Sequence, residues 1–150
     1  MPVAAPVVEV GGHCAFVEEK DDARYLLYKY GTDFEDVAAL VAFHKQVHVA
    51  LQALSPRPVG VIVDQSSESG KRPGPEARKA MMSGDVLENM FAIAFFGADF
   101  PIRSLSTLLI KGARLMGRIP GDVPVVFLKS AEEAWLWMAE RDKSIGQTTS

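Results

Sequence analysis

The sequence has little cysteine, no long apolar run and no excess of positive charge, and each shortage excludes a class of protein. Its single cysteine, Cys14, can form neither an internal disulfide nor a cysteine-rich metal cluster. No unbroken apolar stretch approaches the ~18 residues of a membrane span. Residues 1–12 also lack the basic start and apolar core of a secretion signal. We therefore expect a cytoplasmic protein without a transmembrane segment.

Charge and size limit the partners and the number of domains. The 150 residues carry 16 Lys and Arg against 19 Asp and Glu, for a formal net charge of −3. Nucleic-acid-binding proteins usually need a basic surface to displace counterions from phosphates, so we predict no nucleic-acid partner. With 48% hydrophobic residues the chain can bury one substantial core. We expect one domain, residues 1–150, with a core of about 5–141 and a flexible tail, 142–150.

Apolar alternation in the first part of the chain predicts three antiparallel strands. Gly11 and Gly12 indicate a tight turn, and "EKDDA" indicates a second one. The predicted strands are "VVEV" (7–10), "HCAFVEE" (13–19) and "RYLLYKY" (24–30). Helical periodicity follows, from a predicted N-cap at Thr32 to the proline-rich "SPRP" at 55–58.

Strands and helices alternate in the rest of the chain. Apolar runs at 59–64, 90–97 and 123–129 predict buried strands, and helices are expected from Pro75, Pro101 and Ser130. Ser130 and Glu133 match a capping box, and Gly117 is a helix stop signal. The fold class is therefore α/β, a mixed β-sheet with an antiparallel amino-terminal meander and parallel strands, covered by about four helices.

Three weak motifs occur in a characteristic order. They are the strand ending in Asp64, the Gly- and Pro-rich loop leading into "PEARKAM", and the closing pattern of Phe127, Glu133-Ala134 and Trp137. With this topology, the chain resembles the STAS (sulfate transporter and anti-sigma-factor antagonist) superfamily, and more narrowly its SpoIIAA-like stand-alone bacterial branch. The resemblance implies a fold of that type and a non-enzymatic signalling or regulatory module that binds proteins, often kinases that phosphorylate a serine or threonine.

The loop after the Asp64 strand is the predicted binding site. In open parallel sheets ligands gather at the carboxyl ends of the strands, and hydroxyl and cationic groups before a helix amino end can hold an anion. A solvated turn is the alternative interpretation. The candidate binding residues are Asp64, Ser66, Ser67, Ser69, Lys71, Arg72 and Glu76. The serines precede the predicted helix start at Pro73-Gly74-Pro75, whereas the family's phosphorylated residue lies at the helix start.

Other polar residues give no catalytic set, and we predict no catalytic residue, metal or cofactor. Asp64 with Lys129 offers a phosphoreceiver reading, and the alternative is that Asp64 caps its own loop. His44 and His48 stand four residues apart, as a metal pair would, but an exposed polar helix face is the expectation. Cys14 is expected to be a packing residue.

Apolar residues suggest three further roles. The helix from Pro101 combines leucines and Met116 with Lys111, Arg114 and Arg118; such a helix can lie on a membrane, but covering the sheet is the expectation. A groove beside it would make the chain a lipid or small apolar-ligand binding protein, lined by Phe91, Phe95, Phe96 and Phe100. Trp137 is a candidate partner contact. Uncovered edge strands of the meander predict a homodimer.

Overall fold

The structure is a computed structural model that describes residues 6–20, 23–29, 36–53, 59–66, 74–76, 79, 90–117, 119 and 123–148. Its helices and strands are β1 (Val8–Val10), β2 (His13–Lys20), β3 (Ala23–Lys29), α1 (Val37–Ala53), β4 (Val59–Asp64), β5 (Met90–Phe96), α3 (Phe100–Leu115), β6 (Val125–Leu128) and α4 (Ala131–Thr148). Of the helix predicted from Pro75, the described residues include Pro75, Glu76 and Lys79, which are helical.

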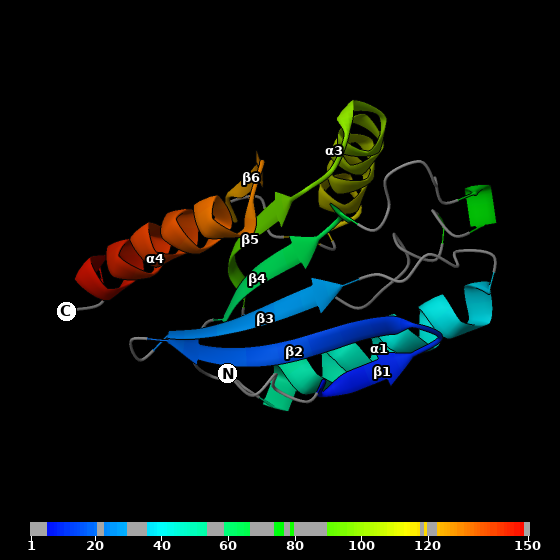
Figure 1. The fold of residues 1–150 in the computed structure, drawn as a ribbon, viewed down its shortest axis with the longest axis horizontal. Coiled ribbons are helices and arrows are strands. Elements are labelled where there is room, and N and C mark those ends of the chain that lie inside the picture. The colour runs from blue at the N-terminus through cyan, green and yellow to red at the C-terminus, as the bar shows by residue number, and fades with distance from the viewer. Residues whose placement is uncertain are drawn as a thin grey trace.

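Six strands form one sheet in chain order, β1-β2-β3-β4-β5-β6 (Figure 1). The strands β1, β2 and β3 pair antiparallel, and β3, β4, β5 and β6 pair parallel. The predicted mixed sheet with an antiparallel amino-terminal meander is therefore confirmed. Gly11 and Gly12 make the first turn with φ of 58° and 86°, and Val10 pairs with His13 across it. Both values lie in the left-handed region, which a two-residue hairpin of this hand requires.

Helices cover the two faces of the sheet differently. Each parallel strand is added on the same side of the previous one, so right-handed crossovers place α1 and α3 on one face. The last helix, α4, follows β6 and packs on the opposite face, and Figure 1 shows α3 and α4 on either side of β5 and β6. The strand β4 is covered on both faces, and five of its six residues are buried.

The core has two parts, one on each face of the sheet. On the α1 face, Leu40, Phe43, Val47 and Leu51 pack against strand residues that include Val61 and Ile93. These α1 positions recur every three or four residues, as one helix face requires. On the α4 face, Ala134 and Met138 pack against Ile62, Ala92 and Ala94. Val61 and Ile62 thus point to different helices, because successive strand residues face opposite sides.

Side chains cap two of the helices. Asp36 Oδ1 accepts a hydrogen bond from the amide of Ala39 at 3.0 Å and starts α1, whereas the predicted cap Thr32 lies outside the described residues. At α4 the predicted capping box is confirmed, since Ser130 Oγ accepts from the amide of Glu133 at 3.2 Å. The Glu133 carboxylate accepts in turn from the Lys129 amide at 2.9 Å.

The helix α4 continues to Thr148, whereas the sequence predicts that the helix ends near Arg141 and that a polar tail follows. The segment 142–148 is polar but contains no proline, and its residues propagate a helix that the capping box has already started. Polarity alone therefore did not identify the end of this helix. Within the described ranges, no helix is long and apolar enough to cross a bilayer.

Replacing Gly60 with alanine is expected to lower the free energy of unfolding by about 1–3 kcal/mol, because it overpacks the core. A Cβ at this position would lie 2.7 Å from Met138 Sδ and 2.9 Å from Tyr25 Cδ1. Urea unfolding measures the change. Gly74→Ala is the matched control, since nothing lies within 4 Å of a Cβ there. Equal stability of the two variants would contradict the tight contact between β4 and α4.

Candidate functional site

A hydrogen-bonded turn closes the carboxyl end of β4. Asp64 Oδ1 accepts from both the amide and the Oγ of Ser66, at 2.9 and 2.5 Å. A carboxylate that bonds to the backbone two residues later is a common way to fix a turn. Asp64 therefore caps its own loop, as one of the two sequence interpretations predicts, while the Ser66 side chain remains exposed.

The end of β5 is shaped to receive this turn. Gly97 has a φ of 83°, and a Cβ on it would lie 3.0 Å from Ser66 Cβ and 3.1 Å from the Ser66 amide nitrogen. The Gln65 amide donates to Phe96 O at 2.9 Å, and the Gly97 amide approaches Leu128 O at 3.4 Å. The ends of β4, β5 and β6 are thus joined at one edge of the sheet.

Gln65 connects this edge to α3. The residue is 3% exposed, and its Nε2 donates to Ser106 Oγ at 2.8 Å. No hydrogen-bond partner of its Oε1 is found among the described residues. Sequence reasoning missed both members of this pair, because a glutamine after a strand and a serine in an amphipathic helix are typical of exposed positions.

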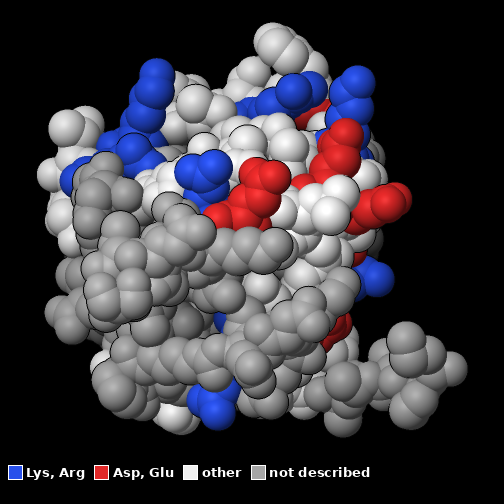
Figure 2. Space-filling view, turned by 90° about the vertical axis from the view of Figure 1, so that its left-hand side faces the viewer, with Lys and Arg blue, Asp and Glu red and all other residues white. Residues whose placement is uncertain are grey.

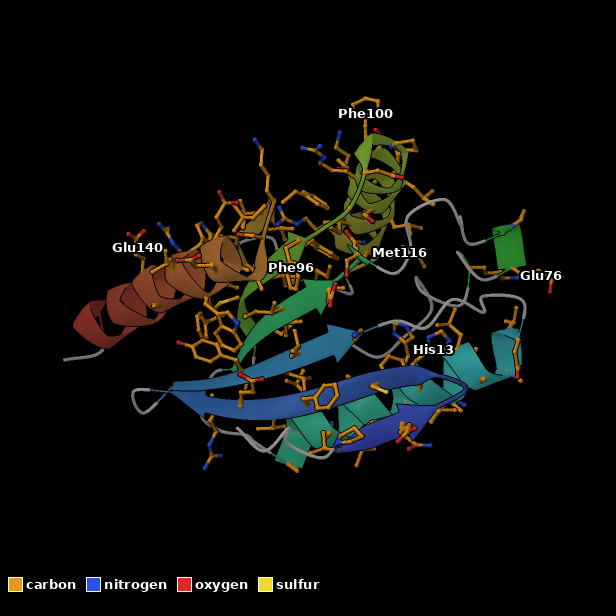
Figure 3. The ribbon with its side chains drawn as sticks, viewed as in Figure 1. His13, Glu76, Phe96, Phe100, Met116 and Glu140 are labelled. Atoms are coloured by element: carbon orange, nitrogen blue, oxygen red, sulfur yellow. The ribbon has the colours of Figure 1, made fainter. Side chains whose placement is uncertain are left out.

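Charged groups surround the turn at the surface. Lys29 is the register partner of Asp64 on the neighbouring strand β3 and is exposed. Lys129 follows β6 at the same edge and is also exposed. Glu76 lies apart from the strand ends, on the short helical turn at the outer side of the molecule (Figure 3). The structure therefore brings Asp64 and Ser66 together and does not bring Glu76 to them.

Four of the predicted binding residues, Ser67, Ser69, Lys71 and Arg72, lie outside the described residues. The predicted anion site in this loop consequently remains a prediction. The described part of the site consists of the Asp64–Ser66 turn, Gly97, the Gln65–Ser106 pair and the two exposed lysines, Lys29 and Lys129. We call this group the β4 edge.

Histidines lie together between α1 and the meander. His13 is fully buried, and its ring centroid is 5.5 Å from that of Phe43, which is 5.7 Å from that of His44. Burial, together with a smaller effect of the nearby His13, lowers the pKa of His44 from 6.5 to about 4. The expectation that His44 and His48 occupy an exposed face is wrong, because both are half-buried. Within the described part of the chain, no three His, Cys, Asp or Glu residues form a metal-binding group.

The wide contact surface of α1 explains this burial. His44 lies one helical turn after Leu40, and His48 lies one turn after His44. Both histidines therefore lie beside the core residues Val47 and Leu51. Cys14 is half-buried on β2, and its thiol pKa is raised by burial and by Glu9, with Lys29 acting in the opposite direction. A raised pKa leaves little thiolate at neutral pH, as expected of a packing residue.

The prediction that four phenylalanines line one groove is wrong, because they do not lie together. Strand alternation places Phe96 on the α4 face and Phe95 on the other, where its ring centroid lies 4.9 Å from that of Phe127, and a register shift next to Met90 adds Phe91 to the α4 face. Phe100 is 74% exposed. Trp137 is half-buried against the α4-face core with the Arg141 guanidinium 5.5 Å from its ring centroid, and its role as a partner contact stays a prediction.

Comparisons with known proteins return no relative. No protein-family profile, no curated protein and no solved structure matches the chain.

Replacing Asp64 with alanine is expected to lower the free energy of unfolding by about 1–3 kcal/mol, because it removes the acceptor of two hydrogen bonds. Thermal or urea unfolding measures the loss. Asp64→Asn is the matched control, because its amide oxygen can still accept from the Ser66 amide. The capping role is refuted if the alanine variant is as stable as the asparagine variant.

Acid is expected to destabilise the fold partly through His44. Its pKa is about 4 in the folded chain against an ordinary 6.5. The neutral form therefore stabilises the fold fully above pH 6.5, and this contribution is lost as the pH falls towards 4, at about 1.4 kcal/mol per pH unit. His44→Gln should show a shallower decline between these limits in urea titrations at fixed pH. Parallel profiles for the two proteins would contradict the burial of a neutral imidazole.

Proposed function

We propose that the chain is a non-enzymatic regulatory module of STAS-like type that binds a protein partner through the β4 edge and the adjoining helix ends. The observation that carries the proposal is that the Asp64 carboxylate accepts hydrogen bonds from Ser66 within its own turn. Both hydrogen bonds given for it hold the turn in shape, so this conspicuous acid acts as a structural cap. A turn fixed in this way presents Ser66 to a partner with little further loss of conformational entropy.

Neighbouring groups extend this surface beyond the turn. Lys129 is exposed beside the capping box of α4, where its own amide is already bonded to Glu133 and its side chain points to solvent. Next to it, β6 is the last strand of the sheet, and no strand in the described ranges pairs with its outer side. Its four residues, Val125–Leu128, are apolar and half-buried. Apolar groups flanked by charge are typical of a protein-binding surface.

The resemblance to the STAS superfamily supports the same site. In that family the loop and helix start after the corresponding strand meet the partner, and here the corresponding strand is β4. Regulation by phosphorylation would act directly on the turn, because a phosphate on Ser66 cannot donate to Asp64 and repels its carboxylate. That the chain has a protein partner, and that a kinase phosphorylates Ser66, are proposals based on this resemblance.

Lys129→Glu is expected to weaken partner binding at least tenfold, because it reverses a charge at the proposed contact. The hydrogen bond described for Lys129 is made by its backbone amide, which the substitution keeps. Affinity purification from the source cells with wild-type and variant protein, followed by quantitative mass spectrometry, would identify proteins lost from the variant. Titration of each such protein against purified wild-type and variant chains then measures the change in Kd.

Lys45→Glu is the matched control, since Lys45 is an exposed lysine on α1, away from the strand ends. A partner that binds through the β4 edge is retained by Lys45→Glu and lost from Lys129→Glu. Equal retention of every protein by both variants contradicts the proposed surface. Catalytic turnover abolished by Asp64→Asn with the fold intact contradicts the non-enzymatic role.

A further inference from the structure

The helix α3 exposes three large apolar side chains to solvent along one side. Phe100 is 74% exposed, Leu108 66%, and Leu115 89%. These positions recur at intervals of about two helical turns, so they lie on one side of the helix. Met116, just after the helix, is 56% exposed and extends the same apolar region. We call these four residues the α3 ridge.

The most buried side chains of α3 are small, and the larger Leu105, Leu109 and Ile110 beside them are half-buried. Ser106 and Ala113, also two turns apart, are its most buried described side chains, at 8% and 9% exposure. Ser106 accepts the hydrogen bond from Gln65, and Arg114 Nη2 donates to Val123 O at 2.6 Å. No described side chain of α3 belongs to either part of the core. Of the apolar residues expected to cover the sheet, Leu108 and Met116 are exposed instead, whereas Leu105 and Leu109 are half-buried.

All charges within α3 are positive. The segment Phe100–Leu115 contains Arg103, Lys111 and Arg114 and no acidic residue, although the whole chain has a net charge of −3. The nearest acid before it is Asp99. Arg103 and Lys111 are exposed on the same helix as the ridge. Another face of the molecule, shown in Figure 2, carries acidic and basic side chains close together. The helix α3 thus combines exposed apolar side chains with basic residues and no acidic ones.

We propose that the α3 ridge docks on the surface of a bilayer that contains anionic lipids. An amphipathic helix binds such a surface by burying its apolar side chains at the boundary of the acyl chains while lysine and arginine reach the headgroups. The ridge supplies the first component, and Arg103 and Lys111 supply the second. Four large side chains exposed over a helix of this length have no other cover within the described ranges.

Shape and charge favour a bilayer over a second copy of the chain. α3 lies at the outside of the molecule, and Phe100 points away from every other element (Figure 3). A projecting ridge suits a flat fluid surface. A two-fold dimer through this helix would bring like charges together, since Arg103 and Lys111 of one copy would face the same basic helix of the other. Anionic headgroups offer the opposite charge.

Vesicle co-sedimentation tests the proposal with the full chain. The probes are phosphatidylcholine vesicles with and without phosphatidylserine. Wild-type protein is expected to sediment with the anionic vesicles, and added salt should weaken binding, because surface electrostatics is screened. The double variant Leu108→Gln, Leu115→Gln should reduce the partition coefficient at least about tenfold, because two leucines no longer enter the apolar layer. Lys111→Glu should also reduce it, and only on the anionic vesicles.

Leu136→Gln is the matched control, because Leu136 is 64% exposed on α4 and is not part of the ridge. This variant should bind vesicles as wild-type does, and circular dichroism should confirm that all variants are folded. The proposal is overturned if wild-type protein does not sediment with anionic vesicles, or if Leu136→Gln lowers binding as much as the double variant. It is also overturned if light scattering shows a dimer that the double variant converts to monomer while vesicle binding is unchanged, since the ridge is then a contact between copies.

Discussion

Burial of β4 on both faces is the constraint on which the rest of the structure depends. Val61 supports the core under α1, and Ile62, one residue later, supports the core under α4. On the α4 face Gly60 leaves room for Met138 and Tyr25, so this side of the strand tolerates no larger side chain without a shift of its neighbours. A strand of this kind cannot carry exposed polar side chains along its length. Polar groups that interact with other molecules must lie where the strand ends.

The β4 edge follows from this constraint. The first residues beyond the buried run are Asp64, Gln65 and Ser66, and each has a separate structural task. Asp64 holds the turn, Gln65 attaches α3, and Ser66 faces solvent. The residue type that suggests chemistry, the aspartate, thus fixes geometry, and the exposed groups around it are the ones available to a partner. This division supports the proposal of a binding module.

Local signals allowed much of the fold to be predicted. The unbroken apolar run "VGVIVD" corresponds to β4, the paired glycines make the first hairpin, and Ser130 with Glu133 caps α4. In each case the physical cause lies within a few residues of the signal. The mixed sheet could be predicted for the same reason, since the alternation of strands and helices restricts the connections.

Features that depend on distant residues could not be predicted. His44 is half-buried because the meander packs over a wide side of α1, and periodicity cannot measure that width. Gln65 and Ser106 are buried together, with one hydrogen bond from Gln65 Nε2 to Ser106 Oγ that joins residues 41 positions apart in the sequence. The apolar residues of α3 were expected to face the sheet, since hydrophobic periodicity identifies an apolar side without saying what covers it. Only the arrangement in space shows that Leu108 faces outward while Leu105 and Leu109 are half-buried.

The way α3 is attached has a consequence for the cooperativity of the fold. Its most buried side chains are the small Ser106 and Ala113, its described leucines are at most half-buried, and hydrogen bonds from Gln65 and to Val123 O hold it. Releasing α3 therefore exposes less apolar surface than releasing α1 or α4, each of which supplies fully buried side chains to the core. Segments of low apolar burial open at a lower free-energy cost than the molecule as a whole. Amide protons of α3 should consequently exchange with solvent through local opening, independently of global unfolding, while those of β4 exchange only when the whole sheet unfolds.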